Sequence, residues 1–154
     1  MDYGCKVRER PAQPTLSIRT RTPVQALPQV LGQAYGEMAQ YLAGLGEQPV
    51  GPPFVAYYNM DMEDLDIEVG LTVSKHVAGK DRIQASELPE GKIATCVHTG
   101  PYGEVGPAYA ALSAWMEANG HVPTGVAYEF YLNDPSETPP EELMTQVVFP
   151  LRTS

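Results

Sequence analysis

Glu129 is the residue in this sequence whose surroundings are least usual for its type. It lies in the stretch VAYEFYLND, residues 126–134, which alternates like a strand and places aromatic or aliphatic residues next to the acid. A carboxylate in such a setting loses hydration, which raises its pKa unless a hydroxyl or a cation compensates it. It could then pair with a cation or act as a general base. The alternative is an ordinary surface residue on the wet face of an antiparallel sheet.

Tyrosine hydroxyls are the candidate partners for this carboxylate, because a phenol donates readily to a carboxylate oxygen. The candidates are Tyr57, Tyr58, Tyr102 and Tyr131. Tyr102 stands in CVHTGPYGEV, where a Gly-Pro turn exposes it just before a helix. As turn chemistry this segment needs no function, and it lacks the basic support of a phosphate-binding loop.

Other kinds of reactive site have little support in the sequence. His76, His98 and His121 stand in different segments without the repeated spacing of metal ligands, so we expect no metal and no cofactor. No local signature of a Ser/His/Asp or Cys/His arrangement is present, which leaves covalent catalysis unsupported. Cys5 and Cys96 lie far apart in the sequence, and we do not expect a structural disulfide.

Length and charge limit the classes of protein that need considering. The 154 residues suit one compact domain, residues 1–154, and 43% of them are hydrophobic. Nineteen acids against ten bases give a net charge of −9, which repels phosphate backbones and disfavours direct nucleic-acid binding. We expect a cytoplasmic protein with no membrane association, because neither a signal peptide nor an apolar run of ~20 residues is apparent.

The chain contains an internal repeat. Residues 31–46, LGQAYGEMAQYLAGLG, align without a gap with residues 105–120, VGPAYAALSAWMEANG, at an offset of 74. The same offset aligns GPPFVAYYN, residues 51–59, with GVAYEFYLN, residues 125–133, so that Tyr35 corresponds to Tyr109 and Val55 to Glu129. We place the two repeats at about 5–74 and 82–152. Because Val55 serves the strand in the first repeat, the acid is not needed to build the fold.

Each repeat is predicted to form a strand, a helix and two further strands. In the first, alternation predicts strands at 15–20, 54–60 and 65–73, and apolar spacing predicts a helix from about 27 to 45 that Gly46 ends in a left-handed cap. In the second, strands are expected at 92–99, 126–133 and 143–151, with a helix over 105–119. A short strand is expected near 81–85. The fold class is therefore α+β, with antiparallel strands and the helices on one sheet face.

Alternation also predicts which residues of the strand at 126–133 share a face. Glu129 and Tyr131 lie on one face, whereas Tyr128 and Phe130 lie on the other, which we assign to the helix-covered core. By the repeat, Val55, Tyr57 and Asn59 share the face of Glu129, and two such faces could enclose an aromatic cavity. The repeat favours Tyr57 over Tyr58 as the inward tyrosine, and a bulge beside Pro53 would reverse the choice. Trp115 is read as a core residue or as a wall of this cavity.

Several segments together resemble the GyrI-like domain, the effector-binding domain of multidrug-sensing MerR-type and AraC-type regulators. They are RPAQPTLSIR, PFVAYYNMD, LPEGKIATCVHTGPYGEV, YEFYLNDP and ELMTQVVFPL, in this order over about 145 residues. The resemblance implies a pseudo-two-fold pair of strand-helix-strand-strand units with a ligand cleft between the halves. It also implies that Glu129 pairs with lipophilic cations, while Tyr57 or Tyr58, Tyr102 and Trp115 line the walls.

The resemblance leaves three functions open. The first is non-catalytic binding or sequestration of amphipathic, cationic or aromatic small molecules, for which the pocket and its charge are enough. The second is a hydrolase that opens the cyclopropane of DNA-alkylating natural products, with Glu129 as the general base. The third is a gyrase-modulating interaction protein with an acidic surface. The chain is similar to stand-alone members of the family, because the fold begins within the first ten residues and leaves no DNA-binding segment.

Overall fold

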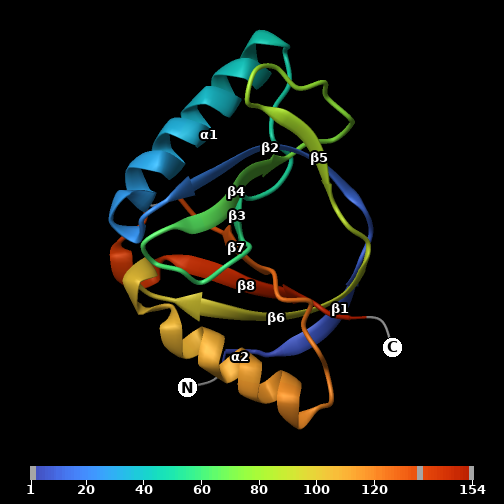
Figure 1. The fold of residues 1–154 in the computed structure, drawn as a ribbon, viewed down its shortest axis with the longest axis vertical. Helices are drawn as coiled ribbons and strands as arrows, with labels where there is room; N and C mark the ends of the chain where they lie inside the picture. Colours follow the sequence, from blue (N-terminus) through green and yellow to red (C-terminus); the bar gives the residue numbers. More distant parts are fainter. Residues whose placement is uncertain (1–2, 135–136, 153–154) are drawn as a thin grey trace. The chain divides into compact units, whose positions relative to one another are not determined.

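The computed structural model describes residues 3–134 and 137–152, and these fall into two compact units. One unit is Ala12–Pro89, and the other combines Met1–Pro11 with Glu90–Ser154. Both contain one α-helix packed on antiparallel strands, as Figure 1 shows, so the predicted α+β class is confirmed. The cleft expected between the two units stays a prediction.

The unit Ala12–Pro89 has four strands in the order β3-β4-β2-β5, with every pair antiparallel. Its elements are β2 (Gln13–Thr22), the short 3₁₀ turn Val24–Ala26, α1 (Leu27–Gly44), β3 (Phe54–Tyr57), β4 (Leu65–Thr72) and β5 (Gln84–Leu88). Helix α1 contacts β2 and β4, and it buries Ala34, Met38 and Leu42. The chain passes so closely over Gly70 that a Cβ there would lie 2.2 Å from the Phe54 ring, which only glycine allows.

The second unit has the order β1-β6-β8-β7, again antiparallel throughout. Its elements are β1 (Lys6–Arg10), β6 (Gly91–Thr99), the 3₁₀ turn Tyr102–Glu104, α2 (Gly106–Ala118), β7 (Ala127–Tyr131), the 3₁₀ turn Pro140–Glu142 and β8 (Met144–Pro150). Helix α2 packs on β6 and buries Ala108, Leu112 and Met116 against Cys96 and Val147. This cluster is the core of the unit.

The two units follow the same plan, while the internal repeat in the sequence stays a prediction. In each, a strand, a helix and two strands are arranged so that the first strand lies between the last strand and an outer strand, β5 or β1. Asn59 and Asn133, which the repeat aligns, close the β3–β4 and β7–β8 connections in the same way. The side-chain oxygen of Asn59 accepts from the Asp66 amide, and that of Asn133 accepts from the Met144 amide. The outer strands come from opposite ends of the sequence, since β1 joins β6 and β5 joins β2.

Both helices begin and end with the same local chemistry. A proline stands in the first turn of each, where its missing N–H costs nothing. After α1, Gly46 adopts φ +72° and the Glu47 amide donates to the Leu42 carbonyl at 2.9 Å. After α2, Gly120 adopts φ +74° and the His121 amide donates to the Met116 carbonyl at 2.9 Å. The left-handed cap predicted at Gly46 is therefore confirmed.

Candidate functional site

Glu129 lies on the sheet face that α2 covers, which corrects the assignment made from alternation. It stands opposite Val147 in the β7–β8 pair, and Val147 stands opposite Cys96 in the β6–β8 pair. Val147 and Cys96 both pack beneath α2, so Glu129 shares their face. The alternation was predicted correctly, but of the two faces of β7 the one without Glu129 is also apolar and buried, with Tyr128 7% and Phe130 8% exposed. Hydrophobicity therefore could not tell which of them meets the helix.

Two tyrosine hydroxyls hold the carboxylate of Glu129. The Tyr109 hydroxyl donates to Oε2 at 2.5 Å, and the Tyr131 hydroxyl donates to Oε1 at 3.1 Å. Burial raises the pKa of Glu129, and the hydrogen bonds from Tyr109 and Tyr131, together with the charge of His98, oppose the rise. Desolvation is the largest of these effects. The site is therefore a largely buried carboxyl whose pKa lies above its usual value.

Tyr109 was not among the predicted site residues, although the repeat aligned it with Tyr35. In the unit Ala12–Pro89 the Tyr35 hydroxyl donates to the Phe54 carbonyl oxygen at 2.7 Å. In the second unit the equivalent hydroxyl donates to Glu129 instead. The signal was therefore present in the alignment, because both repeats carry this tyrosine, whereas the aligned strand position is Val55 in one and Glu129 in the other.

Tyr102 and Tyr131 are brought together near the carboxylate as expected. Their ring centroids lie 5.2 Å apart with the planes tilted by 57°. Burial raises the pKa of Tyr102, and the charge of Asp134 adds to the rise. Trp115 lies on α2 and packs at the margin of the core. Its ring stacks on His121 with the ring centroids 5.7 Å apart. Its surroundings favour the core role over the cavity wall.

The remaining predicted site residues belong to the other unit, Ala12–Pro89. Val55 is fully buried and pairs with Val69, while Tyr57 is half-buried on the same face. Asn59 closes the turn before β4 by donating to the Asp64 carbonyl. Their expected share in a cavity with Glu129 stays a prediction.

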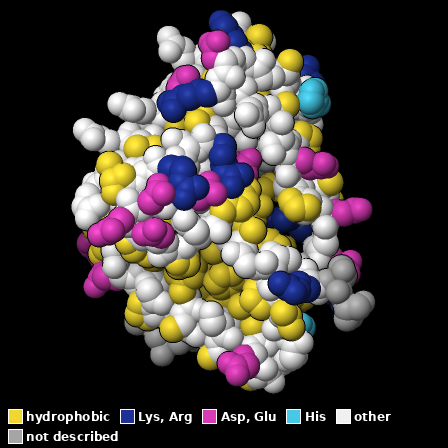
Figure 2. Space-filling model, viewed as in Figure 1, with side chains coloured by type: hydrophobic (Ala, Val, Ile, Leu, Met, Phe, Trp, Pro, Cys, Tyr) yellow, Lys and Arg dark blue, Asp and Glu magenta, His cyan; other side chains and the backbone are white. Residues whose placement is uncertain are grey.

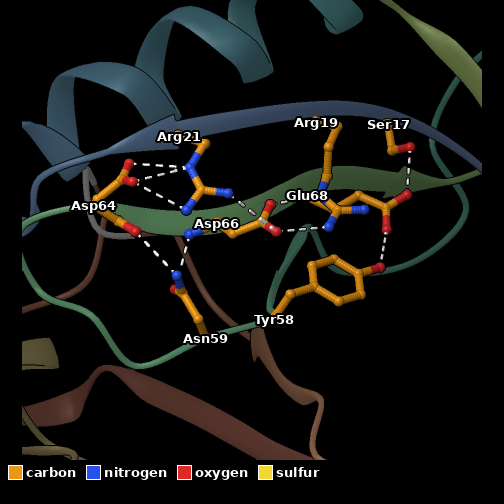
Figure 3. A network of polar contacts seen from close by, with 8 residues as sticks. All are labelled: Ser17, Arg19, Arg21, Tyr58, Asn59, Asp64, Asp66 and Glu68. Carbon is orange, nitrogen blue, oxygen red and sulfur yellow. Dashed lines mark hydrogen bonds and ion pairs between the residues drawn. The ribbon is translucent and has the colours of Figure 1, made fainter.

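Tyr58 points to the opposite face of its sheet, where it joins a polar network that the sequence did not predict. Figure 3 shows its hydroxyl donating to Glu68 Oε1 at 2.5 Å, while the Ser17 hydroxyl donates to Glu68 Oε2 at 2.6 Å. The Arg19 guanidinium lies over the Tyr58 ring, 3.8 Å from its centroid, and forms two hydrogen bonds with Asp66. The hydrogen bond from Arg19 lowers the pKa of Asp66.

This network continues along the strands as exposed ion pairs. Arg21 bonds Asp64 at 3.0 Å, and in the view of Figure 2 basic and acidic side chains accordingly lie next to one another. Each charged group of the network has an oppositely charged or hydroxyl partner within the unit. We therefore assign it a structural role, in which the exposed pairs contribute little to stability because solvent screens them.

A hollow of about 420 Å³ opens at the end of α1, within the unit Ala12–Pro89. It is lined by Glu37, Gln40, Tyr41, Gly44, Leu45, Lys80, Asp81 and Ile83. None of these belongs to the surroundings of Glu129, and the rim is charged and open. Over the described ranges, no three histidines, cysteines or acids gather as metal ligands would. Within those same ranges, neither helix has the length and apolar character needed to cross a membrane.

Comparison with known proteins supports the fold and gives a family. The model of the GyrI-like small molecule binding domain matches residues 5–152. None of the curated proteins matches the sequence. Four solved structures share the fold at low sequence identity.

The EcmrR C-terminal domain has a TM-score of 0.79 and 22% identity, with all of both chains covered. EcmrR in its complex with DNA has a TM-score of 0.85 and 23% identity, and our chain covers 58% of that longer protein. SAV2435 bound to tetraphenylphosphonium has a TM-score of 0.70 and 12% identity, covering 99% of our chain and 94% of its own. A hydrolase from Listeria innocua has a TM-score of 0.72 and 17% identity, covering 96% and 91%. At these identities the likeness is one of fold.

Proposed function

Because the chain belongs to the GyrI-like small-molecule-binding domain family, we propose that it binds amphipathic, cationic or aromatic small molecules at Glu129 without converting them. The observation that carries the proposal is the carboxylate itself, which lies under α2 and is held by Tyr109 and Tyr131 with Tyr102 beside them. An acid that the fold does not require, placed among aromatic rings, suits a cationic ligand better than a neutral one.

The favourable free energy of binding a cation would come from two interactions. Each aromatic face attracts a cation by ~0.5–2 kcal/mol, and more when the cation is desolvated. The carboxylate adds a charge interaction that is several times larger near a half-buried site than in water. Because burial raises the pKa of Glu129, an arriving cation also favours release of its proton. Affinity should therefore rise with pH until the carboxyl is fully ionised.

The relative bound to tetraphenylphosphonium, a lipophilic cation, supports the choice of ligand class. The selectivity expected from rings and one charge is broad, since neither defines a detailed shape.

Calorimetric titration with tetraphenylphosphonium and with a neutral triphenyl analogue tests the proposal. The wild type should bind the cation, and Glu129→Gln should weaken it about 10-fold or more, because the charge interaction is lost while the side chain keeps its size. The neutral analogue should bind both proteins alike. Glu68→Gln is the matched control, because that carboxylate is also held by two hydroxyls but lies in the other unit. Equal cation affinities of the wild type and Glu129→Gln would overturn the proposal.

A hydrolase is the second candidate, and the raised pKa of Glu129 beside tyrosine hydroxyls is the observation that favours it. Glu129 would take a proton from water as the water oxygen attacks an electrophilic cyclopropane carbon. The ring C–C bond at that carbon breaks, its electron pair passes to a carbonyl conjugated with the ring, and a tyrosine hydroxyl would donate to the oxyanion that forms there. A structural neighbour described as a hydrolase agrees with this reading. Incubation with a cyclopropane-bearing alkylating compound distinguishes the two. Product that forms with the wild type and not with Glu129→Gln supports the hydrolase, whereas binding without product excludes it.

A further inference from the structure

A row of polar side chains crosses three strands next to Glu129. Thr145 of β8 stands opposite His98 of β6 on one side and opposite Tyr131 of β7 on the other. Each lies two residues along its strand from a residue of the Glu129 row, so all three project from the face that α2 covers. Cross-strand neighbours of this kind have Cβ atoms about 4.5–5.5 Å apart. The row therefore begins at Tyr131, which bonds Glu129, and ends at His98.

The hydrogen bond of His98 fixes which ring nitrogen carries the proton. Nε2 lies 3.0 Å from the carbonyl oxygen of Pro101, and a carbonyl can only accept. Nε2 therefore donates, and in the neutral ring Nδ1 is left as an acceptor. The ring also lies against Gly100, where an added Cβ would come within 3.4 Å of His98 Cε1. The hydrogen bond to Pro101 holds the imidazole in one orientation.

Two polar atoms of this row are buried without a hydrogen bond. His98 is 5% exposed and Thr145 is 1% exposed. Among the residues that the structure describes, none bonds to His98 Nδ1 or to Thr145 Oγ1. Buried polar groups in folded proteins are nearly always paired, so two orphans on neighbouring strands require an explanation. Both lie on the face of Glu129.

We propose that His98 Nδ1 and Thr145 Oγ1 form the hydrogen-bonding end of the Glu129 site, which therefore takes protonated amines in preference to permanently quaternary cations. The inference rests on the proposed binding function. A protonated amine carries both the charge that Glu129 pairs with and an N–H that Nδ1 can accept, directly or through the Thr145 hydroxyl. A quaternary cation carries only the charge, and it would leave Nδ1 buried and unpaired in the complex.

The test compares two ligands that differ by one methyl group. One is a 3,3-diphenylpropyl dimethylamine, which is protonated at pH 7 and has a single N–H, and the other is its N-methyl quaternary salt. The wild type should bind the amine roughly 10-fold or more tightly than the quaternary salt, because the amine N–H pairs a buried acceptor that the quaternary salt leaves unpaired, as it is in the free protein. Titration calorimetry at one pH and ionic strength measures both affinities.

Substitutions of His98 distinguish the roles of its two ring nitrogens. In His98→Gln an amide nitrogen can still reach the Pro101 carbonyl, but no acceptor takes the position of Nδ1, so the preference for the amine should fall to about 2-fold or less. In His98→Asn the amide oxygen takes the position of Nδ1, and part of the preference should return. Thr145→Val, which removes only the hydroxyl, should also reduce the preference and provides a second test if the histidine variants fold poorly. A thermal unfolding curve for each variant checks that it is folded.

The possible outcomes distinguish a failure of this inference from a failure of the proposed binding function. Equal wild-type affinities for the two ligands, or a preference that persists in both His98→Gln and Thr145→Val, would overturn the inference alone, provided that Glu129→Gln still weakens both ligands. If the wild type binds neither ligand, the proposed function fails and this inference fails with it.

Discussion

At the scale of single residues, the two units provide a comparison inside one chain. Tyr35 and Tyr109 occupy aligned positions on aligned helices, yet one hydroxyl donates to a backbone carbonyl and the other to a carboxylate. The difference follows from Val55 and Glu129, the aligned residues of β3 and β7. A fold position that accepts valine needs no charge, so the acid in the second unit points to a role in binding or chemistry.

The tyrosine pair yields a prediction with its own control. Tyr109→Phe removes a hydrogen bond that favours the ionised carboxylate, so it should weaken cation binding at pH 7 by about 3- to 10-fold. Tyr35→Phe should leave binding unchanged and lower the free energy of unfolding by ~1 kcal/mol. Calorimetry and urea unfolding measure the two effects. Equal losses of affinity in both variants would contradict the assignment of Tyr109 to the site.

Glu129 should also make stability depend on pH in a defined direction. Burial raises the pKa of this carboxyl in the folded protein above its value in the unfolded chain, so the folded state holds the proton more tightly. The resulting stabilisation is fully present below the unfolded pKa and is lost as the pH rises through the folded pKa. The melting temperature of the wild type relative to Glu129→Gln should therefore increase as the pH is lowered from about 7.5 to about 4.5. A difference that stays constant over this range would exclude a raised pKa.

The residues of the site show what the sequence could and could not predict. The unusual setting of Glu129 and its contact with Tyr131 followed from alternation and composition. Its sheet face did not, because Tyr128 and Phe130 are as apolar as any core residue. His98 and Thr145 were missed as well, since a lone histidine and a threonine carry no spacing signal until strand pairing brings them together.

At the scale of elements, the glycine that follows each helix terminates it. Gly46 and Gly120 both adopt positive φ, and each is followed by an amide that satisfies a carbonyl of the last helical turn. The helices and the strands of the repeat were predictable because hydrophobic spacing and these stops agree. Strand β1 was not predicted, since its sequence KVRER is charged and has no apolar face to reveal it. The other outer strand, β5, was expected near 81–85 and forms at Gln84–Leu88.

Glycine substitutions in and after α1 should act with opposite signs. Gly46→Ala forces an L side chain into the left-handed region and should lower the free energy of unfolding by about 1 kcal/mol or more. Gly36→Ala, at an exposed position in the interior of α1 where a Cβ meets nothing within 4 Å, should raise it by about 0.5–1 kcal/mol. Urea unfolding of both variants measures these values. Stabilisation by Gly46→Ala would contradict the cap.

At the scale of the whole molecule, the two units differ in whether one continuous segment of the sequence forms them. Ala12–Pro89 is continuous, whereas the other unit joins Met1–Pro11 to Glu90–Ser154. Strand β1 is therefore an edge strand whose sequence neighbour, β2, belongs to the other unit. Its partner is β6, against which Lys6 to Arg10 pair in full register.

Removal of residues 1–11 should therefore destabilise the unit that contains Glu90–Ser154 before it affects Ala12–Pro89. Without β1, strand β6 becomes an edge and its outward amides lose their acceptors, so hydrogen exchange should accelerate in β6 and β8. Amides of β2, which follows the deletion in the sequence, and of its partner β4 should keep their protection because β2 retains both of its partners. Mass spectrometry of exchanged peptides compares the two regions. Faster exchange in β2 than in β6 would show that the division into units is wrong.

The discontinuous unit also bears on synthesis at the ribosome. β1 is made early, but β6 begins at Gly91, so β1 must remain without its partner while the entire intervening unit is translated. At ~5–20 residues per second this interval is on the order of ten seconds, much longer than a small unit needs to fold. Ala12–Pro89 can be complete before then. The many charges of KVRER would keep the waiting strand from aggregating during that time.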